Sequence, residues 1–144
     1  MEGVFLSELR QISHSKGDIF HALKATDESY MGFGEAYFSF IWKGEVKGWK
    51  RHTEMTLNLV VPQGKIRFVV FDDREQSQTK GEYKEFFLSP DNYKRLTVAP
   101  DLWVAFQGCG PRENMLLNIA SIPHDPKESV NREINEVPYD WSLL

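Results

Sequence analysis

The feature that most constrains the fold of this chain is a succession of short apolar or alternating segments. They are about four to eight residues long, and glycine or proline turn signals separate them at spacings of about a dozen residues. Examples are EAYFSFIW, MTLNLVV, IRFVVF, EYKEFFL and WVAF. Little in the chain repeats at helical period, so the pattern predicts an all-β fold, either an antiparallel sandwich or a barrel.

The whole chain, residues 1–144, is predicted to form a single domain, because 144 residues suit one hydrophobic core. The strands should occupy about residues 4–122. From Pro123 onward the alternation dissolves into a polar segment that contains three prolines. We expect residues 123–144 to form an irregular tail that wraps the surface, with one short helical turn at 128–132.

Composition excludes several classes of protein. The 41% of hydrophobic and 13% of aromatic residues support a packed core rather than a disordered chain. A net charge of −4 argues against a nucleic-acid-binding protein, and no apolar run approaches the length of a membrane span. The single cysteine, Cys109, leaves no internal disulfide and no zinc-type cysteine spacing. The first residues do not resemble a signal peptide, so a cytoplasmic protein is expected.

The stretch KGWKRHTEM, residues 47–55, holds the most informative polar residues. If residues 49–61 form one strand, alternate side chains share a face. The polar face would then carry Lys50, His52, Glu54, Thr56 and Asn58. The core face would carry Trp49, Arg51, Thr53, Met55, Leu57, Leu59 and Val61. Gly48 suits a bulge that turns Lys47 toward the polar face. Two interpretations stay open: a solvated surface on which Lys50 and His52 pair with Glu54, or the wall of a cavity.

A resemblance to a known family rests on four segments: GDIFHAL, GEVKGWK, DLWVAF and the run from Phe71 to Pro100, which contains SQTKG and LSPDN. Across roughly residues 15–126 the chain resembles the dTDP-4-dehydrorhamnose 3,5-epimerase family. The resemblance implies a cupin-type jelly-roll barrel of about ten strands that is commonly dimeric. It also implies a cofactor-free epimerase or isomerase. Such an enzyme would act on a 4-keto-6-deoxyhexose nucleotide, dTDP-linked, in polysaccharide precursor synthesis.

The catalytic positions of that family are only partly kept. Lys50 stands where the family has its base histidine, and Val104 where it has a second histidine. The family's general-acid tyrosine has no counterpart at 121–122, and its enolate-stabilising lysine has none at 57–58. A related branch, the dTDP-sugar ketoisomerases, carries two histidines two positions apart, and this chain keeps the second of them as His52.

Two residues are predicted to be catalytic. His52 is the expected acid/base, because imidazole exchanges a proton readily near neutral pH and the reaction removes a proton next to a ketone. Lys50, as a cation, suits the enolate oxygen or a diphosphate. Glu54 would orient the imidazole or neutralise Lys50, and Asp125 is a second candidate for orienting the imidazole.

A wider set is predicted to bind the substrate: Lys47, Glu54, Asn58, Arg67, Arg74 and Trp103. Lys47 takes the place of a substrate-binding arginine of the family. The two arginines suit bidentate contacts with a diphosphate, and Trp103 or Tyr37 would stack on the nucleotide base. Two alternatives stay open: Arg74 closes a turn with a neighbouring aspartate, and the aromatic residues belong to the core.

No metal site and no cofactor are expected. The cupin ligand set would fall on Lys50, His52, a residue near Asn58 and Val104, and neither lysine nor valine suits it.

The predicted partners are a nucleotide-sugar ligand and a second copy of the chain, since the edge strands of a short domain need cover. A second class of function stays open. The chain would then be a catalytically silent relative that binds a nucleotide sugar or glycan, or that scaffolds a biosynthetic complex.

Overall fold

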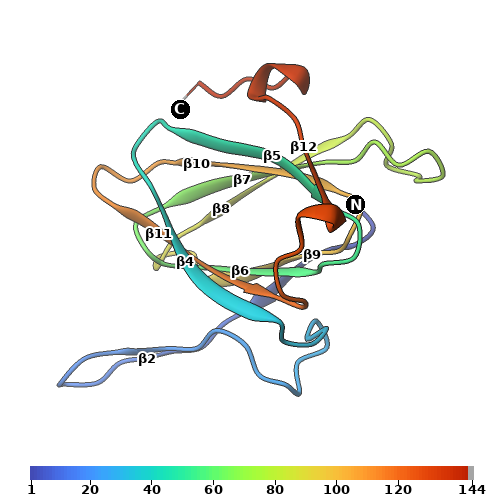
Figure 1. The fold of residues 1–144 in the computed structure, drawn as a ribbon. Coiled ribbons are helices and arrows are strands. Elements are labelled where there is room, and N and C mark those ends of the chain that lie inside the picture. The colour runs from blue at the N-terminus through green and yellow to red at the C-terminus, as the bar shows by residue number, and fades with distance from the viewer. Residues whose placement is uncertain (143–144) are drawn as a thin grey trace.

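The computed structural model describes residues 1–142, whose regular secondary structure consists of strands apart from two short 3₁₀ helices (Figure 1). Two five-stranded antiparallel sheets face each other, with the orders β1-β9-β6-β11-β4 and β12-β5-β10-β7-β8. The strands of the first sheet are β1 (Val4–Glu8), β9 (Lys94–Val98), β6 (Leu57–Gln63), β11 (Asn114–Ala120) and β4 (Glu35–Ile41). Those of the second are β12 (Ser129–Asn131), β5 (Val46–His52), β10 (Trp103–Gly108), β7 (Ile66–Phe71) and β8 (Tyr83–Leu88). This arrangement confirms the predicted all-β antiparallel fold.

Three smaller elements lie outside the two sheets. A hairpin of β2 (Gln11–Ile12) and β3 (Ile19–Phe20) extends away from the body of the molecule at the lower left of Figure 1. Two 3₁₀ helices, η1 (Pro126–Glu128) and η2 (Ile134–Glu136), lie in the C-terminal segment. Within the described residues, no helix has the length and apolar character needed to cross a membrane.

The main core fills the space between the two sheets. Alternate residues of β6 and β7 meet there, Leu59 and Val61 from one sheet and Phe68 and Val70 from the other, each almost completely buried. The alternation that predicted the strands therefore also determines which side chains enter the core, because successive side chains point to opposite faces of a sheet.

A second apolar cluster lies on the outer face of the second sheet, under the C-terminal segment. Trp49 and Trp103 are completely buried there against Val137, with Tyr139 and Trp141 packed over them. In Figure 1 the segment, drawn in red, runs across this sheet. Both faces of the second sheet are therefore covered, and the residues of β5 divide between an inner side and this outer side.

The prediction of one strand from 49 to 61 is wrong. β5 ends at His52 in the second sheet, and β6 begins at Leu57 in the first. Between them the backbone N–H groups of Glu54 and Met55 donate to the Glu128 carboxylate, at 3.0 Å each, instead of to a neighbouring strand. The break reverses the alternation. On β5 the even-numbered Lys50 and His52 face the space between the sheets, whereas on β6 the odd-numbered Leu57, Leu59 and Val61 do so.

The bulge expected at Gly48 is present. On β10, Val104 pairs with Lys50 and Phe106 pairs with Lys47, so two residues of β5 lie opposite one residue of β10. Gly48 has a φ of 135°, and a Cβ there would approach the Cβ of Ala105 to 2.6 Å. Only glycine fits this conformation and this close approach, and the bulge turns Lys47 to the same side as Lys50.

The C-terminal segment differs in part from the predicted irregular tail. It wraps the surface as expected, but it also contributes β12, which pairs with β5. The helical turn predicted at 128–132 is wrong in position, because η1 spans Pro126–Glu128 and the chain is extended from Ser129. Asp125 begins η1 by accepting a hydrogen bond from the Lys127 amide at 3.0 Å.

Candidate active site

A cavity of about 360 Å³ lies between the two sheets, and we call it the inner cavity. Its polar wall includes Tyr37 from β4, Asn118 from β11, and Lys47, Lys50 and His52 from β5. Its apolar wall consists of Leu57, Leu59, Val104, Phe106 and Leu116. Residues 131–133 of the C-terminal segment close one side. The cavity has the mixture of apolar walls and few polar groups that is typical of small-molecule sites.

His52 is held in this cavity by a carboxylate from a distant part of the chain. Its Nδ1 contacts Oε1 of Glu128, a residue that is 4% exposed, at the end of η1. The other carboxylate oxygen, Oε2, accepts the two backbone amides of Glu54 and Met55. Because an ionised carboxylate only accepts, Nδ1 carries the hydrogen and Nε2 is left as a proton acceptor.

The ionisation of Glu128 follows from the same contacts. Burial by itself raises the pKa of this carboxyl, but the hydrogen bonds from His52 and from the two backbone amides outweigh burial. The net effect is a pKa below the ordinary value, so Glu128 is a carboxylate at neutral pH. The Glu128 carboxylate therefore holds a fixed negative charge beside the imidazole ring.

Neither carboxylate predicted to orient the imidazole does so. Glu54 has an exposed side chain, and its backbone rather than its carboxylate contacts the pair. Asp125 caps η1 instead. The alternative of a solvated surface pairing of His52 with Glu54 is also wrong. Sequence reasoning missed Glu128 because it is 76 residues away from His52 and lies in a segment without a clear pattern.

The two lysines of the inner cavity differ in their contacts. The Lys47 amine donates to Oγ of Ser39 at 3.2 Å and to the carbonyl oxygen of Phe40 at 2.7 Å. Lys50 lines the cavity, and within residues 1–142 its amine has no hydrogen bond or ion pair, with Glu54 or any other residue. Lys50 is therefore the cation in this wall that is available to a ligand.

Across the cavity, Tyr37 and Asn118 form a pair on neighbouring strands. They are register partners on β4 and β11, and Nδ2 of Asn118 donates to the Tyr37 hydroxyl oxygen at 2.9 Å. Burial raises the pKa of the Tyr37 phenol, the nearby Glu35 charge adds to this, and the hydrogen bond from Asn118 opposes it. Tyr37 was weighed from the sequence as a base-stacking residue, and Asn118 was not considered.

Five of the six residues predicted to bind the substrate lie outside the inner cavity: Glu54, whose side chain is exposed, and four residues with partners elsewhere. Asn58 points to the outer face of the first sheet, where its Oδ1 accepts from Arg95 at 3.0 Å, because the break after β5 reverses the alternation. Arg67 is buried under the C-terminal segment, where it donates to Glu85 and to the carbonyl oxygens of Asp140 and Ser142.

The other two residues have structural partners as well. Arg74 pairs with Asp72 at 2.9 Å, which matches the turn-closing alternative, and this pairing together with hydroxyl donors holds the pKa of Asp72 far below its ordinary value. Trp103 belongs to the outer cluster, and its Nε1 donates to Asp73 at 2.9 Å. None of these four residues lines the inner cavity.

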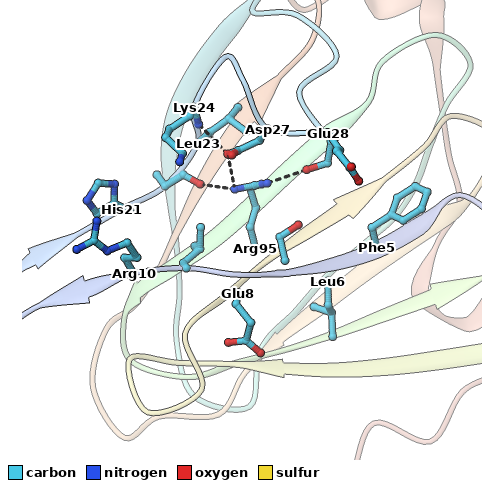
Figure 2. A pocket seen from close by; sticks show the side chains of 14 residues that line it. Phe5, Leu6, Glu8, Arg10, His21, Leu23, Lys24, Asp27, Glu28 and Arg95 are labelled. Atoms are coloured by element: carbon cyan, nitrogen blue, oxygen red, sulfur yellow. Dashed lines mark hydrogen bonds and ion pairs between the residues drawn. The ribbon is translucent and has the colours of Figure 1, made fainter.

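A second and larger hollow, of about 710 Å³, lies on the outer face of the first sheet between β1 and the loop of residues 21–29. We call it the outer hollow. Figure 2 shows Arg95 at its centre, with dashed lines to Asp27 and to the neighbouring loop. The guanidinium donates to Asn58, to the carbonyl oxygen of Ala22 and to Oγ of Ser29, and Asp27 lies 3.3 Å away. The donors of Arg95, the buried charged group of this hollow, therefore already have partners.

Residues with metal-ligand chemistry do not gather in the part of the chain that the structure describes. Within residues 1–142 no group of three or more histidine, cysteine, aspartate or glutamate side chains is placed to hold a metal ion. The chemistry available in the inner cavity is therefore that of an oriented imidazole, a phenol and an ammonium group.

Comparisons with known proteins give consistent results, although no family model matches the chain. A solved structure of a dTDP sugar isomerase from Desulfovibrio desulfuricans G20 is 38% identical, with a TM-score of 0.93 over 97% of this chain and 91% of that one. A probable low-salt glycan biosynthesis epimerase from Haloferax volcanii is 30% identical over 73% of this chain, and the match spans 66% of that relative's length. A spore coat polysaccharide biosynthesis protein from Bacillus subtilis is 25% identical over 99% of this chain and 97% of its own length.

More distant solved structures share the fold. One is a dTDP-6-deoxy-D-glucose-3,5-epimerase from Legionella pneumophila in complex with dTDP-4-keto-L-rhamnose, 17% identical with a TM-score of 0.83 over 99% of this chain and 80% of that one. Together these comparisons confirm the predicted jelly roll and the predicted class of enzyme. The chain belongs to the dTDP-4-dehydrorhamnose 3,5-epimerase-like family of nucleotide-sugar epimerases and isomerases.

Proposed function

We propose that this enzyme moves a proton at the carbon next to the ketone of a nucleotide-linked 4-keto-6-deoxyhexose, giving an epimer or an isomer for polysaccharide precursor synthesis. The observation that supports this most is His52, held by the buried Glu128 carboxylate with Nε2 left to accept a proton in the inner cavity. A similar dTDP sugar isomerase, a similar glycan biosynthesis epimerase and, at 18% identity, a 4-keto-6-deoxy sugar epimerase support the class of substrate.

The reaction divides among four side chains. His52 takes the proton from carbon, and the Glu128 carboxylate stabilises the imidazolium that forms. Tyr37 donates a hydrogen bond to the ketone oxygen as negative charge develops there, which a phenol with a raised pKa does without being deprotonated. The Lys50 ammonium adds a positive charge for the enolate oxygen or for the diphosphate. A proton delivered by water to the opposite face of the same carbon gives an epimer. A proton returned by His52 to the former ketone carbon gives an isomer, with the neighbouring hydroxyl passing its proton to the former ketone oxygen and becoming the new ketone.

The nucleotide is proposed to be dTDP, since distant relatives have been crystallised with dTDP sugars. The same proposal places the enzyme in the cytoplasm, where nucleotide-activated sugars are made. Trp103, Arg67 and Arg74 are not available for the nucleotide in the described structure, so we assign its phosphates to Lys50 and Lys47 at the mouth of the inner cavity.

A homodimer is also proposed. The edge strand β4 carries large apolar side chains that face away from the core, among them Phe38, 60% exposed, and Phe40, 42% exposed. An exposed aromatic row on an unpaired edge strand is typical of a surface that another chain covers. Light scattering of the purified protein at micromolar concentration tests this: we expect twice the mass of the chain, and a strict monomer would contradict it.

The experiment that tests the function is solvent deuterium exchange. With dTDP-4-keto-6-deoxyglucose in D₂O, proton NMR should show loss of the signal at C3 or C5 in the presence of the enzyme. His52→Asn should slow this exchange by about 10²–10⁴-fold, the usual contribution of a general base. His124→Asn, at an exposed position in the C-terminal segment, is the matched control and should leave the exchange rate unchanged.

The same samples decide between an enzyme and a silent relative. The replacements at Lys50 and Val104 are the observations that favour the second function, binding without catalysis. Calorimetric titration with the same nucleotide sugar would then show binding, while deuterium would not enter the sugar in any of the three proteins. That combination of results would overturn the proposed enzyme activity, and the proposal that the protein binds a nucleotide sugar would stand.

A further inference from the structure

Asn118 has an unusual hydrogen-bonding state for a buried residue. It lines the inner cavity from β11 and is 7% exposed. Its Nδ2 donates to Tyr37, but its Oδ1 is shielded from solvent and has no hydrogen-bond partner within residues 1–142. Buried polar atoms are nearly always hydrogen-bonded, so an unpaired acceptor beside a cavity indicates that a bound molecule supplies the missing donor.

The contact between Asn118 and Tyr37 also determines where the hydroxyl hydrogen of Tyr37 points. The hydroxyl oxygen of Tyr37 accepts the Nδ2 hydrogen, so the hydroxyl hydrogen points away from Asn118. Tyr37 itself lines the cavity and is 46% exposed. The pair thus presents one donor, the Tyr37 hydroxyl, and one acceptor, Oδ1 of Asn118, from neighbouring positions on two adjacent strands.

We propose that Asn118 is the residue that positions Tyr37 for the reaction and selects a sugar with a hydroxyl group next to its ketone. In this arrangement the Tyr37 hydroxyl donates to the ketone oxygen, and the neighbouring sugar hydroxyl donates to Oδ1 of Asn118. A 4-keto hexose with a hydroxyl at C3 has these two groups on adjacent carbons. The inference rests on the proposed function, and it adds the feature of the substrate that the site recognises.

The chemistry assigned to Asn118 involves no proton transfer of its own. His52 removes the proton from carbon, the electron pair moves toward the ketone oxygen, and the hydrogen bond from Tyr37 stabilises the charge that collects there. Asn118 keeps the Tyr37 hydrogen directed at that oxygen and anchors the adjacent hydroxyl. Loss of Asn118 should therefore lower the rate of the chemical step and the preference for a hydroxylated sugar.

The sharpest variant is Asn118→Asp, which keeps the size of the side chain and reverses its hydrogen bonding. A carboxylate only accepts, so the Tyr37 hydrogen turns toward position 118 and away from the ketone. We expect kcat for deuterium exchange to fall by about 100–1,000-fold, the order of a lost oxyanion donor. The affinity for dTDP alone should stay within about twofold, because the proposed function assigns its phosphates to Lys50 and Lys47 and not to this pair.

A second variant protects the test against a folding defect. Tyr37→Phe removes one oxygen at a half-exposed position, and we expect the same loss of kcat. In the Tyr37→Phe background, adding Asn118→Asp should lower kcat no further, because Asn118 acts through Tyr37 in catalysis. A purely structural role for Asn118 would instead give a further loss in the double variant together with a lower melting temperature.

The substrate preference is tested with the 3-deoxy analogue of the same dTDP-4-keto sugar, followed by deuterium exchange at C5. The native enzyme should favour the 3-hydroxy sugar in kcat/KM by at least about tenfold, and Asn118→Leu should lose most of this preference. Unchanged kcat in Asn118→Asp, or an unchanged preference in Asn118→Leu, would overturn the inference while leaving the proposed function intact. Absence of exchange by the native enzyme would instead overturn the proposed function, and this inference with it.

Discussion

The inner cavity and the outer hollow lie on opposite faces of the first sheet, and they differ most in the state of their polar groups. In the outer hollow, which has about twice the volume, Arg95 is 2% exposed and three hydrogen bonds and Asp27 satisfy its guanidinium. In the inner cavity Lys50 and Oδ1 of Asn118 have no partner within residues 1–142, and His52 is oriented by a buried carboxylate. The satisfied arginine of the outer hollow holds the fold together, whereas the inner cavity, with oriented and available groups, is suited to a ligand.

The largest effect is expected from replacing the buried arginine of the outer hollow. Arg95→Met should lower the free energy of unfolding by about 3 kcal/mol, because Asp27 and Asn58 then lose a buried partner. Urea denaturation measures this loss. The rate of deuterium exchange per folded molecule should stay within about twofold of the native rate. A large loss of deuterium exchange in a folded Arg95→Met protein would contradict the purely structural role of the outer hollow.

The next effect concerns the carboxylate behind His52. Glu128→Gln keeps the shape but removes the charge that stabilises the imidazolium, so kcat should fall by about 10–100-fold. The matched control is Glu28→Gln, because Glu28 is an exposed carboxylate that lines the outer hollow. Exchange kinetics by NMR should show a native rate for Glu28→Gln. Equal rates for the two variants would contradict the role of Glu128.

A smaller effect is expected at Lys50. Lys50→Ala should weaken binding of the dTDP sugar by about tenfold, the loss of one charge-assisted contact. The free energy of unfolding should change by less than about 1 kcal/mol, since no ion pair within residues 1–142 is broken. Calorimetric titration measures the affinity, and Lys24→Ala in the outer hollow is the control that should bind normally. Unchanged affinity in Lys50→Ala would mean that this amine does not meet the ligand.

The smallest expected effect is a pH dependence of stability. The pKa of Glu128 in the folded chain is lowered from its ordinary value of 4.5, so its carboxylate stabilises the fold above that pH. This contribution is lost as the pH falls through the folded pKa. The difference in unfolding free energy between the native protein and Glu128→Gln should therefore be larger at pH 6 than at pH 3.5. A difference that grows toward low pH would show that the pKa of Glu128 is raised rather than lowered.

The sequence predicted one side of the inner cavity and missed the other. The alternation in β5 and the glycine at its bulge place Lys47, Lys50 and His52 on one face, and the structure shows these residues lining the cavity. Both features are local, because they depend on the period of a strand and on the conformational freedom of glycine. The strands themselves were predictable for the same reason.

The residues that were missed depend on contacts between distant segments. Glu128 reaches His52 only after the C-terminal segment has folded back across the second sheet, and Asn118 meets Tyr37 through pairing of β11 with β4. Asn58 was assigned to the wrong face because the backbone amides after β5 bind Glu128, which ends the strand early. Arg67 and Trp103 have the chemistry of ligand-binding residues, but the C-terminal segment packs over both and supplies carbonyl acceptors to Arg67.

The central claim is that the ligand occupies the inner cavity and not the larger outer hollow. A crystal structure of the protein with a dTDP-linked 4-keto-6-deoxyhexose, or with dTDP and the product sugar, tests it most directly. We expect the hexose between β4 and β5, within hydrogen-bonding distance of His52, Tyr37 and Asn118, with the diphosphate near Lys50. A nucleotide sugar bound instead beside Arg95, between β1 and the loop of residues 21–29, would contradict the account.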